Sequence, residues 1–289
     1  MSLGEKAQPH LTEEFYVRRY EVMLTAQTIG RDLKKIREQV PLVHNITNYV
    51  VMNLTANALL SIGASPVMAH AEEEVEDMVS LASAVVINIG TLSPHWVKAM
   101  QKAIRAAGKK KIPVVLDPVG AGATPYRTAT ARKLLIEGAV AIIRGNGSEI
   151  RALADSGART KGVDSLEGSE AAVEAAGKIS RQFHCAVSIS GATDIVVGGE
   201  RVIRIANGHP LMPRVTGLGC VASAITGAFV AVNSDYLEAA AGAMAVMGIC
   251  GEMAAEKAEG PASFELHFLD WLYLVGEKEI AARLKIKVE

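Results

Sequence analysis

The chain has 289 residues, with 30 basic and 31 acidic side chains and a formal net charge of −1. This balance argues against nucleic acid as a partner, because no basic excess is available to neutralise phosphates. The three cysteines, Cys185, Cys220 and Cys250, are far apart and lack CxxC spacing, which argues against a disulfide framework or a zinc site and predicts a reducing compartment.

The N-terminal region carries no export signal. Met1 to His10 is polar, and Leu11 to Val40 is interleaved with charges, so we expect a cytoplasmic protein. Residues 215–234 contain no Asp, Glu, Lys or Arg, and this uncharged stretch is as long as a membrane-spanning helix. Because Gly217, Gly219 and Asn233 interrupt this stretch, we interpret it as a buried core helix and expect no membrane partner.

Apolar and charged residues alternate with a helical period over Glu13–Gln39, which predicts a long N-terminal helix. Strands and helices then alternate. The expected strands are Pro41–His44, Pro66–Ala69, Ala84–Ile89, Val114–Leu116, Val140–Ile143 and Ala186–Ile189. The expected helices are Tyr49–Ile62, Glu72–Leu81, Pro94–Ala107 (ended by Gly108), Tyr126–Ile136, Ser148–Ala154 and Ser169–Phe183.

The rest of the chain departs from this alternation. Asp194–Val197 and Arg201–Ile205 predict a hairpin at the sheet edge, and three closing helices are expected at Val221–Val232, Tyr236–Lys257 and Ser263–Val275. The whole pattern predicts an α/β fold with a mostly parallel central sheet covered by helices on both faces. No linker or repeat divides the chain, so we expect one domain over residues 1–289, with 1–39 as its N-terminal helical segment.

Polar residues follow several of the predicted strands, where ligands bind in open α/β sheets. Asp117 ends one strand, Arg144, Asn146 and Glu149 follow another, and Ser190 ends a third. Each also has a structural interpretation. Asp117 before Pro118 is typical of a turn, Asn146 and Ser148 are typical helix caps, and Arg144 is compatible with a surface ion pair.

A glycine turn, Gly217-Leu-Gly-Cys220, precedes the first closing helix. Its free N–H groups predict an anion-binding concavity, although Cys220 is equally compatible with a small buried hydrophobe. Together these residues fit phosphoryl transfer. Asp117 and Glu149 suit Mg²⁺, Arg144 suits phosphate oxygens, and the N–H groups of Gly217 to Cys220 suit developing negative charge.

No P-loop or protein-kinase motif is present. Instead the sequence resembles the hydroxyethylthiazole kinase family of the ribokinase-like superfamily. The resemblance spans about Val40 to Leu274. It is carried by 42–48 (Leu-Val-His-Asn-Ile-Thr-Asn), 55–68, 88–91 (Asn-Ile-Gly-Thr), 116–119 (Leu-Asp-Pro-Val), 144–150, 217–220 and 259–264.

The resemblance implies a three-layer ribokinase-like fold and phosphorylation by ATP, with Mg²⁺, of the hydroxyl of 4-methyl-5-(2-hydroxyethyl)thiazole in thiamine salvage. It also implies a homotrimer with active sites between subunits. The site residues that we expect are substrate contacts Met68, Gly217, Asn48, Val50 and Gly90, ATP contacts Arg144, Ser190, Asn146 and Gly219, metal ligands Asp117 and Glu149, and catalytic Cys220.

Two of these positions, Ser190 and Cys220, and the neighbouring Leu218 need comment. Family members often carry Thr where Ser190 stands and a small residue where Leu218 stands; Ser190 keeps the hydroxyl, whereas Leu218 could narrow the pocket. Related sugar kinases place an Asp base where Cys220 stands. A thiol with a pKa near 8.5 is mostly protonated at neutral pH unless the helix N-terminus lowers it, so we expect a modest catalytic role for Cys220.

Three other functions remain open at this point. A nucleotide-dependent dehydratase of hydrated NAD(P)H shares the fold, and a hydroxymethylpyrimidine kinase is a nearer relative. Cys220 and the blocks 45–48 and 64–68 favour a thiazole pocket over both. A non-catalytic thiazole binder would be expected to lack the carboxylates Asp117 and Glu149, which are present.

Overall fold

The computed structural model describes residues 24–138, 140–154 and 165–289. Its helices are α2 (Ala26–Gln39), α3 (Met52–Ile62), α4 (Val75–Leu81), α5 (Pro94–Lys110), α6 (Pro125–Glu137), α7 (Gly147–Ala154), α8 (Ser165–Phe183), α9 (Leu218–Val230), α10 (Tyr236–Ala255), α11 (Pro261–Leu274) and α12 (Glu277–Arg283). Its strands are β1 (Leu42–Ile46), β2 (Ser65–Val67), β3 (Ala84–Asn88), β4 (Val114–Asp117), β5 (Ile142–Asn146), β6 (Ala186–Ser190), β7 (Asp194–Gly198), β8 (Arg201–Ile205) and β9 (Ile286–Val288).

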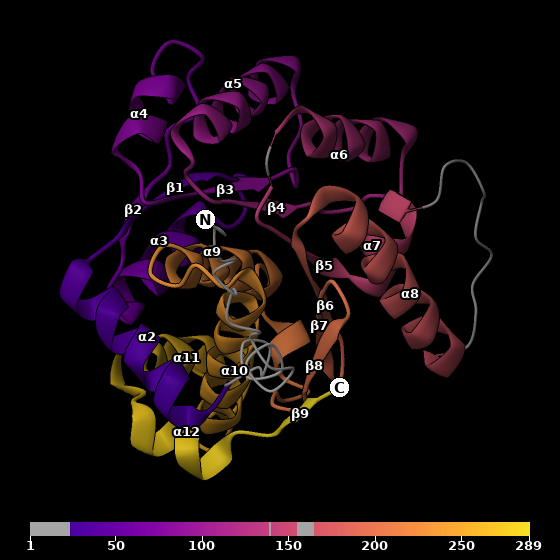
Figure 1. Cartoon of the computed structure of the whole chain (residues 1–289). Coiled ribbons are helices and arrows are strands. Elements are labelled where there is room, and N and C mark those ends of the chain that lie inside the picture. Colours follow the sequence, from indigo (N-terminus) through magenta and orange to yellow (C-terminus); the bar gives the residue numbers. More distant parts are fainter. Residues whose placement is uncertain (1–23, 139, 155–164) are drawn as a thin grey trace, which may run out of the picture.

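The strands form one sheet in the order β2-β1-β3-β4-β5-β6-β7-β8-β9 (Figure 1). Strands β1 to β6 are mutually parallel, and the pairs from β6 to β9 are antiparallel. The carboxyl ends of six strands therefore lie along the same edge of the sheet. This confirms the predicted α/β class and its mostly parallel sheet.

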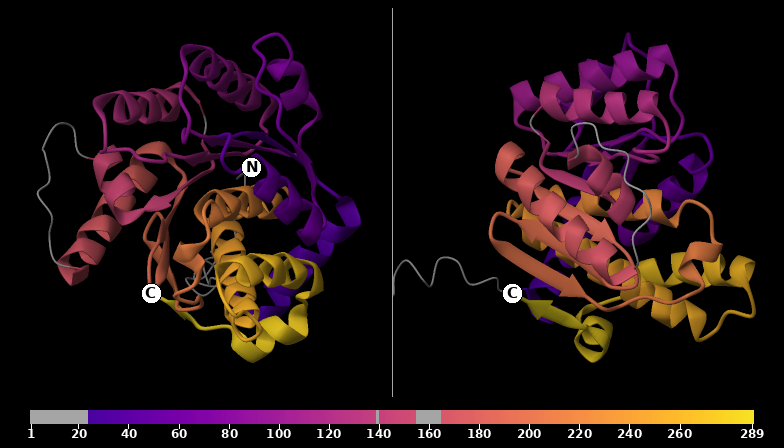
Figure 2. Two further views of the ribbon diagram at one scale, coloured as in Figure 1. Left: turned by 180° about the vertical axis from the view of Figure 1, so that it is seen from behind. Right: turned by 90° about the vertical axis from the view of Figure 1, so that its right-hand side faces the viewer.

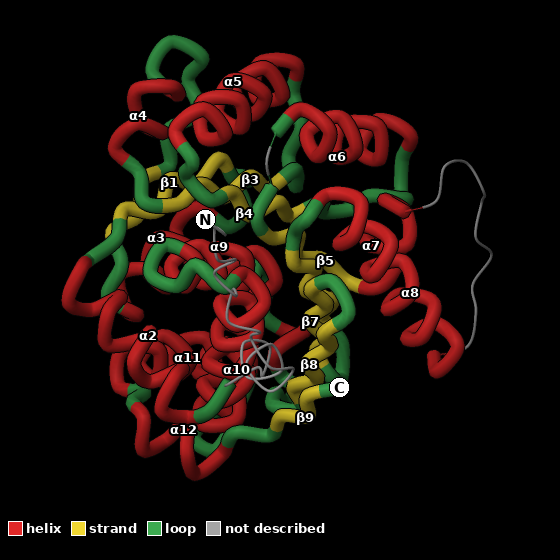
Figure 3. The backbone as a smooth tube through the Cα atoms, viewed as in Figure 1, coloured by secondary structure: helices red, strands yellow, loops and turns green. Residues whose placement is uncertain are grey.

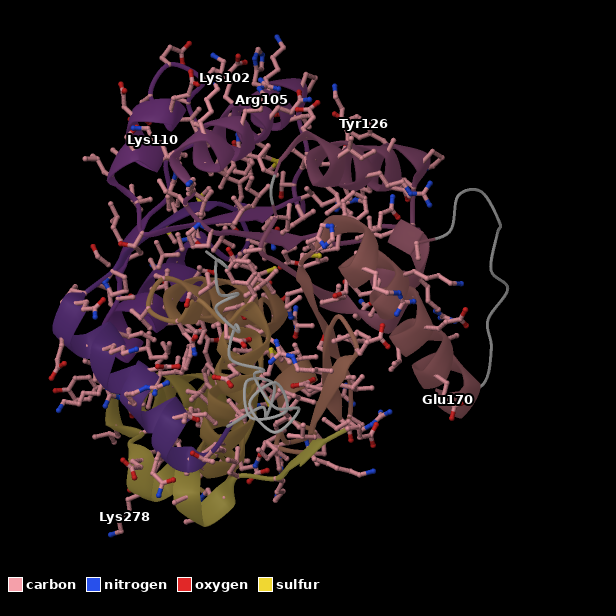
Figure 4. The ribbon with its side chains drawn as sticks, in the orientation of Figure 1. Lys102, Arg105, Lys110, Tyr126, Glu170 and Lys278 are labelled. Atoms are coloured by element: carbon pink, nitrogen blue, oxygen red, sulfur yellow. The ribbon has the colours of Figure 1, made fainter. Side chains whose placement is uncertain are left out.

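Helices cover both faces of the sheet. Helices α4 to α8 pack on one face, and α2, α3 and α9 to α12 pack on the other (Figures 1 and 2). Neighbouring residues of a strand contribute to different cores, as in β3, where Val86 packs with α9 and Val85 with α5. The tube view in Figure 3 shows the strands as a curved layer between the two sets of helices. Charged side chains such as Lys102, Arg105 and Lys278 point outward from this body (Figure 4).

Two apolar helices occupy the centre of one layer. Of the residues of α9, Gly219 and Cys220 alone are not buried, which confirms the buried-core interpretation of this stretch. Helix α10 is long and apolar enough to cross a membrane, but 89% of its apolar window is buried inside the protein. Both helices are therefore core elements, and α9 brings its N-terminus to the carboxyl edge of the sheet.

Some sequence predictions of elements were wrong. Helix α2 begins at Ala26, where the Thr25 side chain caps it, and residues 13–23 of the predicted helix lie outside the described residues. Helix α5 does not end at Gly108 as predicted. It continues to Lys110 and ends because Lys111 adopts the left-handed conformation. Helix α9 begins at Leu218 rather than Val221, since Gly217, with φ +87°, already turns the chain into the helix.

The C-terminus also differs from the prediction. Two elements were not predicted, α12 and β9, and β9 pairs with β8. The β7–β8 hairpin therefore does not form the sheet edge. The signal for β9 is short, because Ile286 and Val288 are its only apolar residues.

Candidate active site

Three neighbouring parallel strands deliver polar side chains to the same edge of the sheet. Strand β3 ends at Asn88 and β4 ends at Asp117, and these residues are partners in the strand register. Asn48 follows β1, the neighbour of β3 on the other side. All three side chains are buried, so their polar atoms need partners inside the protein.

The partners form one hydrogen-bond network. Asp117 Oδ2 accepts hydrogen bonds from Asn88 Nδ2 at 2.6 Å and from Ser223 Oγ, on α9, at 2.7 Å. Asn88 Oδ1 accepts from Asn48 Nδ2 at 3.0 Å, and Asn48 Nδ2 also lies 3.5 Å from the sulfur of Cys220. The network thus joins the carboxylate of Asp117 to the thiol of Cys220.

Burial shifts the pKa of both end groups. It raises the pKa of Asp117 to about 6, against the opposing effects of the Arg144 charge and the Ser223 and Asn88 hydrogen bonds. It also raises the pKa of Cys220 to about 11, helped by the negative charge of Asp117. Position in the first turn of α9 does not offset burial, so Cys220 is a neutral thiol at neutral pH.

The turn before α9 brings backbone N–H groups to this edge. Gly217 is the N-cap residue with φ +87°, and a Cβ there would lie 2.6 Å from Val51 Cγ1. A Cβ on Gly219 would lie 3.0 Å from Arg144 Nη1. Side chains at these two positions would therefore separate the turn from α3 and from Arg144.

Arg144 lies in β5 and is 8% exposed. Its Nε has no hydrogen-bond partner within the described ranges. Its positive charge acts to lower the pKa of Asp117 and of Asp194. Asp194 is buried too, accepts the N–H of Gly191 at 3.0 Å, and has its pKa raised to about 6 by that burial. A buried cation without hydrogen-bond partners is costly unless a ligand supplies them.

Arg144 faces a cavity of about 750 Å³. The polar part of its lining includes Ser190 at the end of β6, Asp194, Asn207 and His209. The glycine turn forms another wall through Thr216 to Gly219. The remaining lining is largely apolar and includes Met212, Pro213, Met244 and Met247. Such a cavity can hold a flat apolar group at one end and an anion at the other.

Glu149 is held at the N-terminus of α7. Its Oε1 accepts the N–H of Gly120, from the loop after β4, at 2.8 Å, and its Oε2 accepts the N–H of Asn146 at 2.8 Å. Asn146 Oδ1 accepts from Glu149 N and from Ser148 Oγ, so the predicted capping role of Asn146 is confirmed. Glu149 therefore ties the loop after β4 to the turn after β5.

The carboxylates offer only a sparse metal site. Nowhere in residues 24–138, 140–154 and 165–289 do three His, Cys, Asp or Glu side chains come together to hold a metal ion. Asp117 and Glu149 are nevertheless close enough for the charge of Glu149 to raise the pKa of Asp117. Because Mg²⁺ keeps several waters and phosphate oxygens, two hard carboxylates fit it and would not fit a metal that needs a full protein cage.

Of the remaining predicted substrate residues, Gly90 lies at this network. A Cβ on Gly90 would lie 2.6 Å from Asn48 Nδ2, so Gly90 belongs to the same cluster. Met68 follows β2 and is half-buried, whereas Val50 is 70% exposed. Neither Met68 nor Val50 takes part in the hydrogen-bond network, because their side chains carry no N–H or O–H group.

Sequence reasoning missed four residues at this edge: Asn88, Ser223, Asp194 and Arg127. Asn88 is a polar residue at the end of an apolar strand, which is the same signal that identified Asp117. Ser223 lies three residues after Cys220, which places it on the same side of α9. Arg127 donates to the carbonyls of Ile89, Gly90 and Val119, and no sequence pattern predicts such a clamp on the two loops.

Comparison with known proteins reveals close relatives. The sequence model of the hydroxyethylthiazole kinase family matches residues 33–278. The chain is 58% identical to the hydroxyethylthiazole kinase of Syntrophus aciditrophicus over 92% of its own length and 98% of that protein. It is 50% identical to that of Desulfotalea psychrophila, over 90% and 95% of the two chains.

Solved structures agree with this. A hydroxyethylthiazole kinase protein from Pyrococcus horikoshii superposes with a TM-score of 0.85 at 47% identity, over 91% of this chain and 99% of that one. A pyridoxal kinase from Staphylococcus aureus superposes with a TM-score of 0.61 at 16% identity, over 86% and 99%. The second likeness concerns the fold alone, and with the first it confirms the predicted fold of a central sheet between two layers of helices.

Proposed function

This chain belongs to the hydroxyethylthiazole kinase family, and we propose that phosphorylation of the hydroxyl of 4-methyl-5-(2-hydroxyethyl)thiazole, in thiamine salvage, takes place at the carboxyl edge between Arg144 and Cys220. ATP is the co-substrate of a kinase of this family. The observation that supports the location best is the buried guanidinium of Arg144, which faces the cavity with an Nε that has no partner within the described ranges.

The ATP phosphates are assigned to the part of the cavity lined by Arg144 and Ser190. Arg144 supplies a fixed positive charge and free donors for phosphate oxygens. Ser190 supplies a hydroxyl, and the N–H of Gly219 adds a donor at the N-terminus of α9. Asn146 keeps its NH₂ group for a phosphate oxygen, because the cap uses only its Oδ1.

Magnesium is assigned to Asp117 and Glu149. Both hydrogen bonds to the Asp117 carboxylate within the described ranges engage Oδ2, which leaves Oδ1 for a cation or its water. Bound there, Mg²⁺ would neutralise charge on the phosphate oxygens. Removal of the cation with a chelator is expected to abolish turnover.

The thiazole is assigned to the Asn48 side of the network. Asn48 lies beside Cys220, Gly90 adjoins Asn48, and Gly217 begins the turn that carries Cys220; Met68 and Val50 are assigned to the same pocket from the family resemblance. The neutral thiol of Cys220 is a poor base but can contact the acceptor hydroxyl. Because a loose transition state lets the hydroxyl proton leave late, positioning and charge neutralisation carry the reaction.

We further propose a homotrimer in the cytoplasm, with active sites between subunits. Large apolar side chains are exposed on α3 and α11, namely Leu60, Leu266, Tyr273 and Leu274. Tyr49 and Val50 are exposed beside the thiazole residues as well. A neighbouring subunit that covers Val50 would make it part of a pocket, which is consistent with its assignment as a substrate contact.

The other functions considered for the sequence are not favoured. The relatives at 50–58% identity are kinases for hydroxyethylthiazole, so neither the dehydratase nor the hydroxymethylpyrimidine kinase has comparable support. A non-catalytic binder is disfavoured by the same relatives.

The direct test is incubation of the purified protein with Mg²⁺, ATP and hydroxyethylthiazole, with the thiazole followed by mass. A product heavier by one phosphoryl group, formed in step with ADP, is expected. Phosphorylation of hydroxymethylpyrimidine in place of the thiazole would redirect the proposal to the pyrimidine kinase. Absence of any phosphorylated alcohol, where a known kinase works in the same assay, would reject it.

A further inference from the structure

Asn88 occupies the centre of the network described above. It is the last residue of β3, is 1% exposed, and lies between the residues that follow β1 and those that end β4. Both ends of its carboxamide are used. Nδ2 donates to Asp117 Oδ2 at 2.6 Å, while Oδ1 accepts from Asn48 Nδ2 at 3.0 Å and from the N–H of Gly90 at 2.9 Å.

The surroundings fix the orientation of this carboxamide. The N–H of Gly90 is a donor in any protonation state, and the carboxylate of Asp117 is an acceptor when ionised. A reversed carboxamide would set its NH₂ against the Gly90 N–H and its oxygen against Asp117. Asn88 therefore has a single arrangement that satisfies both neighbours.

We propose that Asn88 is a positioning residue that holds the Asp117 carboxylate with one end and the Asn48–Gly90 wall of the thiazole site with the other. The two halves of the active site, phosphoryl side and acceptor side, are thereby held in one fixed relation. This inference rests on the proposed site of thiazole phosphorylation. Ser223 differs from Asn88 in an instructive way, because it donates to the same Asp117 oxygen but has no hydrogen bond to Asn48 or Gly90.

Three side-chain replacements separate the two ends. Asn88→Ala removes both. Asn88→Asp keeps an oxygen acceptor toward Asn48 and Gly90 but sets a second carboxyl group against Asp117. Ser223→Ala removes a donor to Asp117 and leaves the acceptor side intact. Loss of a buried hydrogen bond to a charged group corresponds to roughly a tenfold to hundredfold effect on rate.

Steady-state kinetics with varied thiazole and varied ATP provide the measurement. We expect Asn88→Ala to lower kcat about tenfold to hundredfold and to raise the KM for thiazole about fivefold or more, with the KM for ATP nearly unchanged. Asn88→Asp and Ser223→Ala are expected to lower kcat while the KM for thiazole stays within about twofold of wild type.

A matched control tests for simple loss of stability. Ser180 is a buried hydroxyl that donates to Cys185 O and accepts the N–H of Gly199, away from the carboxyl edge. Ser180→Ala is expected to lower the melting temperature without changing kcat or either KM. If Asn88→Ala fails to fold, Asn88→Asp alone still tests the inference, because a fivefold or larger rise in its KM for thiazole would contradict the expected value within about twofold of wild type.

The inference is overturned if Asn88→Asp raises the KM for thiazole as much as Asn88→Ala does. It is also overturned if Asn88→Ala lowers only the melting temperature, as Ser180→Ala does. Failure of the proposed function looks different, because the wild-type protein itself would then form no thiazole phosphate, and the assigned site would be lost together with the role of Asn88.

Discussion

Asn146 Oδ1 accepts the backbone N–H of Glu149 at 3.0 Å, and Glu149 Oε2 accepts the backbone N–H of Asn146 at 2.8 Å. This reciprocal cap begins α7, and the second oxygen of Glu149 accepts the N–H of Gly120 from the loop after β4. The carboxylate assigned to magnesium is therefore fixed by two backbone donors before any ligand binds. The Glu149 side chain therefore needs little rearrangement when the phosphates bind.

Replacement of Glu149 by Gln is expected to affect both stability and activity. The amide can accept with one oxygen only, so one of the two backbone N–H groups faces an NH₂ group. We expect the free energy of unfolding to fall by about 1–3 kcal/mol, measured by urea denaturation, and kcat to fall at least tenfold.

A surface glutamate provides the control for this variant. Glu174→Gln, which removes the exposed ion pair with Lys178, is expected to leave the melting temperature and kcat close to wild type. If Glu149→Gln behaved like Glu174→Gln, the bridging role of the Glu149 carboxylate would be rejected.

The neutral thiol of Cys220 predicts slow chemical modification. Because burial raises its pKa to about 11, the reactive thiolate is scarce at pH 7–8. Alkylation by iodoacetamide, followed at the Cys220 peptide by mass spectrometry, is expected to accelerate up to at least pH 10. A reaction that already reaches its plateau near pH 8 would contradict the neutral thiol.

The catalytic role of Cys220 has its own test. Cys220→Ala is expected to bind both substrates and to lose between a few-fold and about a thousandfold in kcat, since a thiol that is not ionised contributes mainly by contact. A loss above about ten-thousandfold with binding intact would exceed typical acid–base contributions and show that Cys220 is an essential base.

Asp194 predicts a pH dependence of stability. Burial raises its pKa from 3.8 to about 6, so the folded protein binds this proton more tightly than the unfolded chain does. The resulting stabilisation is fully present below about pH 4 and is lost as the pH rises through about 6. At pH 7.5 the ionised side chain therefore costs stability.

The variant Asp194→Asn keeps an oxygen for the Gly191 N–H and removes the charge. We expect its free energy of unfolding to exceed that of the wild type by about 1–3 kcal/mol at pH 7.5, with the difference shrinking toward zero at pH 4. Thermal unfolding at the two pH values measures this. An equal change in the free energy of unfolding at both pH values would show that ionisation of Asp194 does not cause the difference between variant and wild type.

Two glycines with positive φ allow strain and crowding to be separated. Gly217 has φ +87° and no room for a Cβ, whereas Gly199 has φ +65° with nothing within 4 Å of an added Cβ. Gly199→Ala is expected to cost about 1 kcal/mol from backbone strain alone. Gly217→Ala is expected to lower the free energy of unfolding by clearly more, and to lower kcat, because Val51 must move. Equal losses of unfolding free energy in the two variants would contradict the crowding at Gly217.

Much of the fold was predictable because its strands are buried on both faces. Apolar runs such as Ala84–Asn88 and Val114–Asp117 are bounded by turns and alternate with capped helices, so local sequence and tertiary burial agree. The outermost strand of the sheet, β9, was not predictable. Strand β9 has three residues and is defined by its pairing with β8, which no local pattern encodes.

The candidate site was predictable where a charge lay at or just after a strand end, or where a glycine turn preceded a helix. Asp117, Arg144 and Glu149 stood out for this reason. Asn88 and Ser223 did not, because their role depends on which strand neighbours β4 and how α9 is rotated against the sheet. Arg127 is a further case, since it lies on α6 and donates to the carbonyls of two loops, after β3 and after β4.

The measurement that tests this account most directly is a crystal structure with Mg²⁺, a non-hydrolysable ATP analogue and hydroxyethylthiazole. The account predicts phosphate oxygens within about 3.2 Å of the Arg144 guanidinium and of N–H groups between Gly217 and Cys220, with the thiazole hydroxyl beside the sulfur of Cys220. Phosphates bound away from Arg144, or a thiazole ring bound away from Asn48 and Gly90, would contradict it.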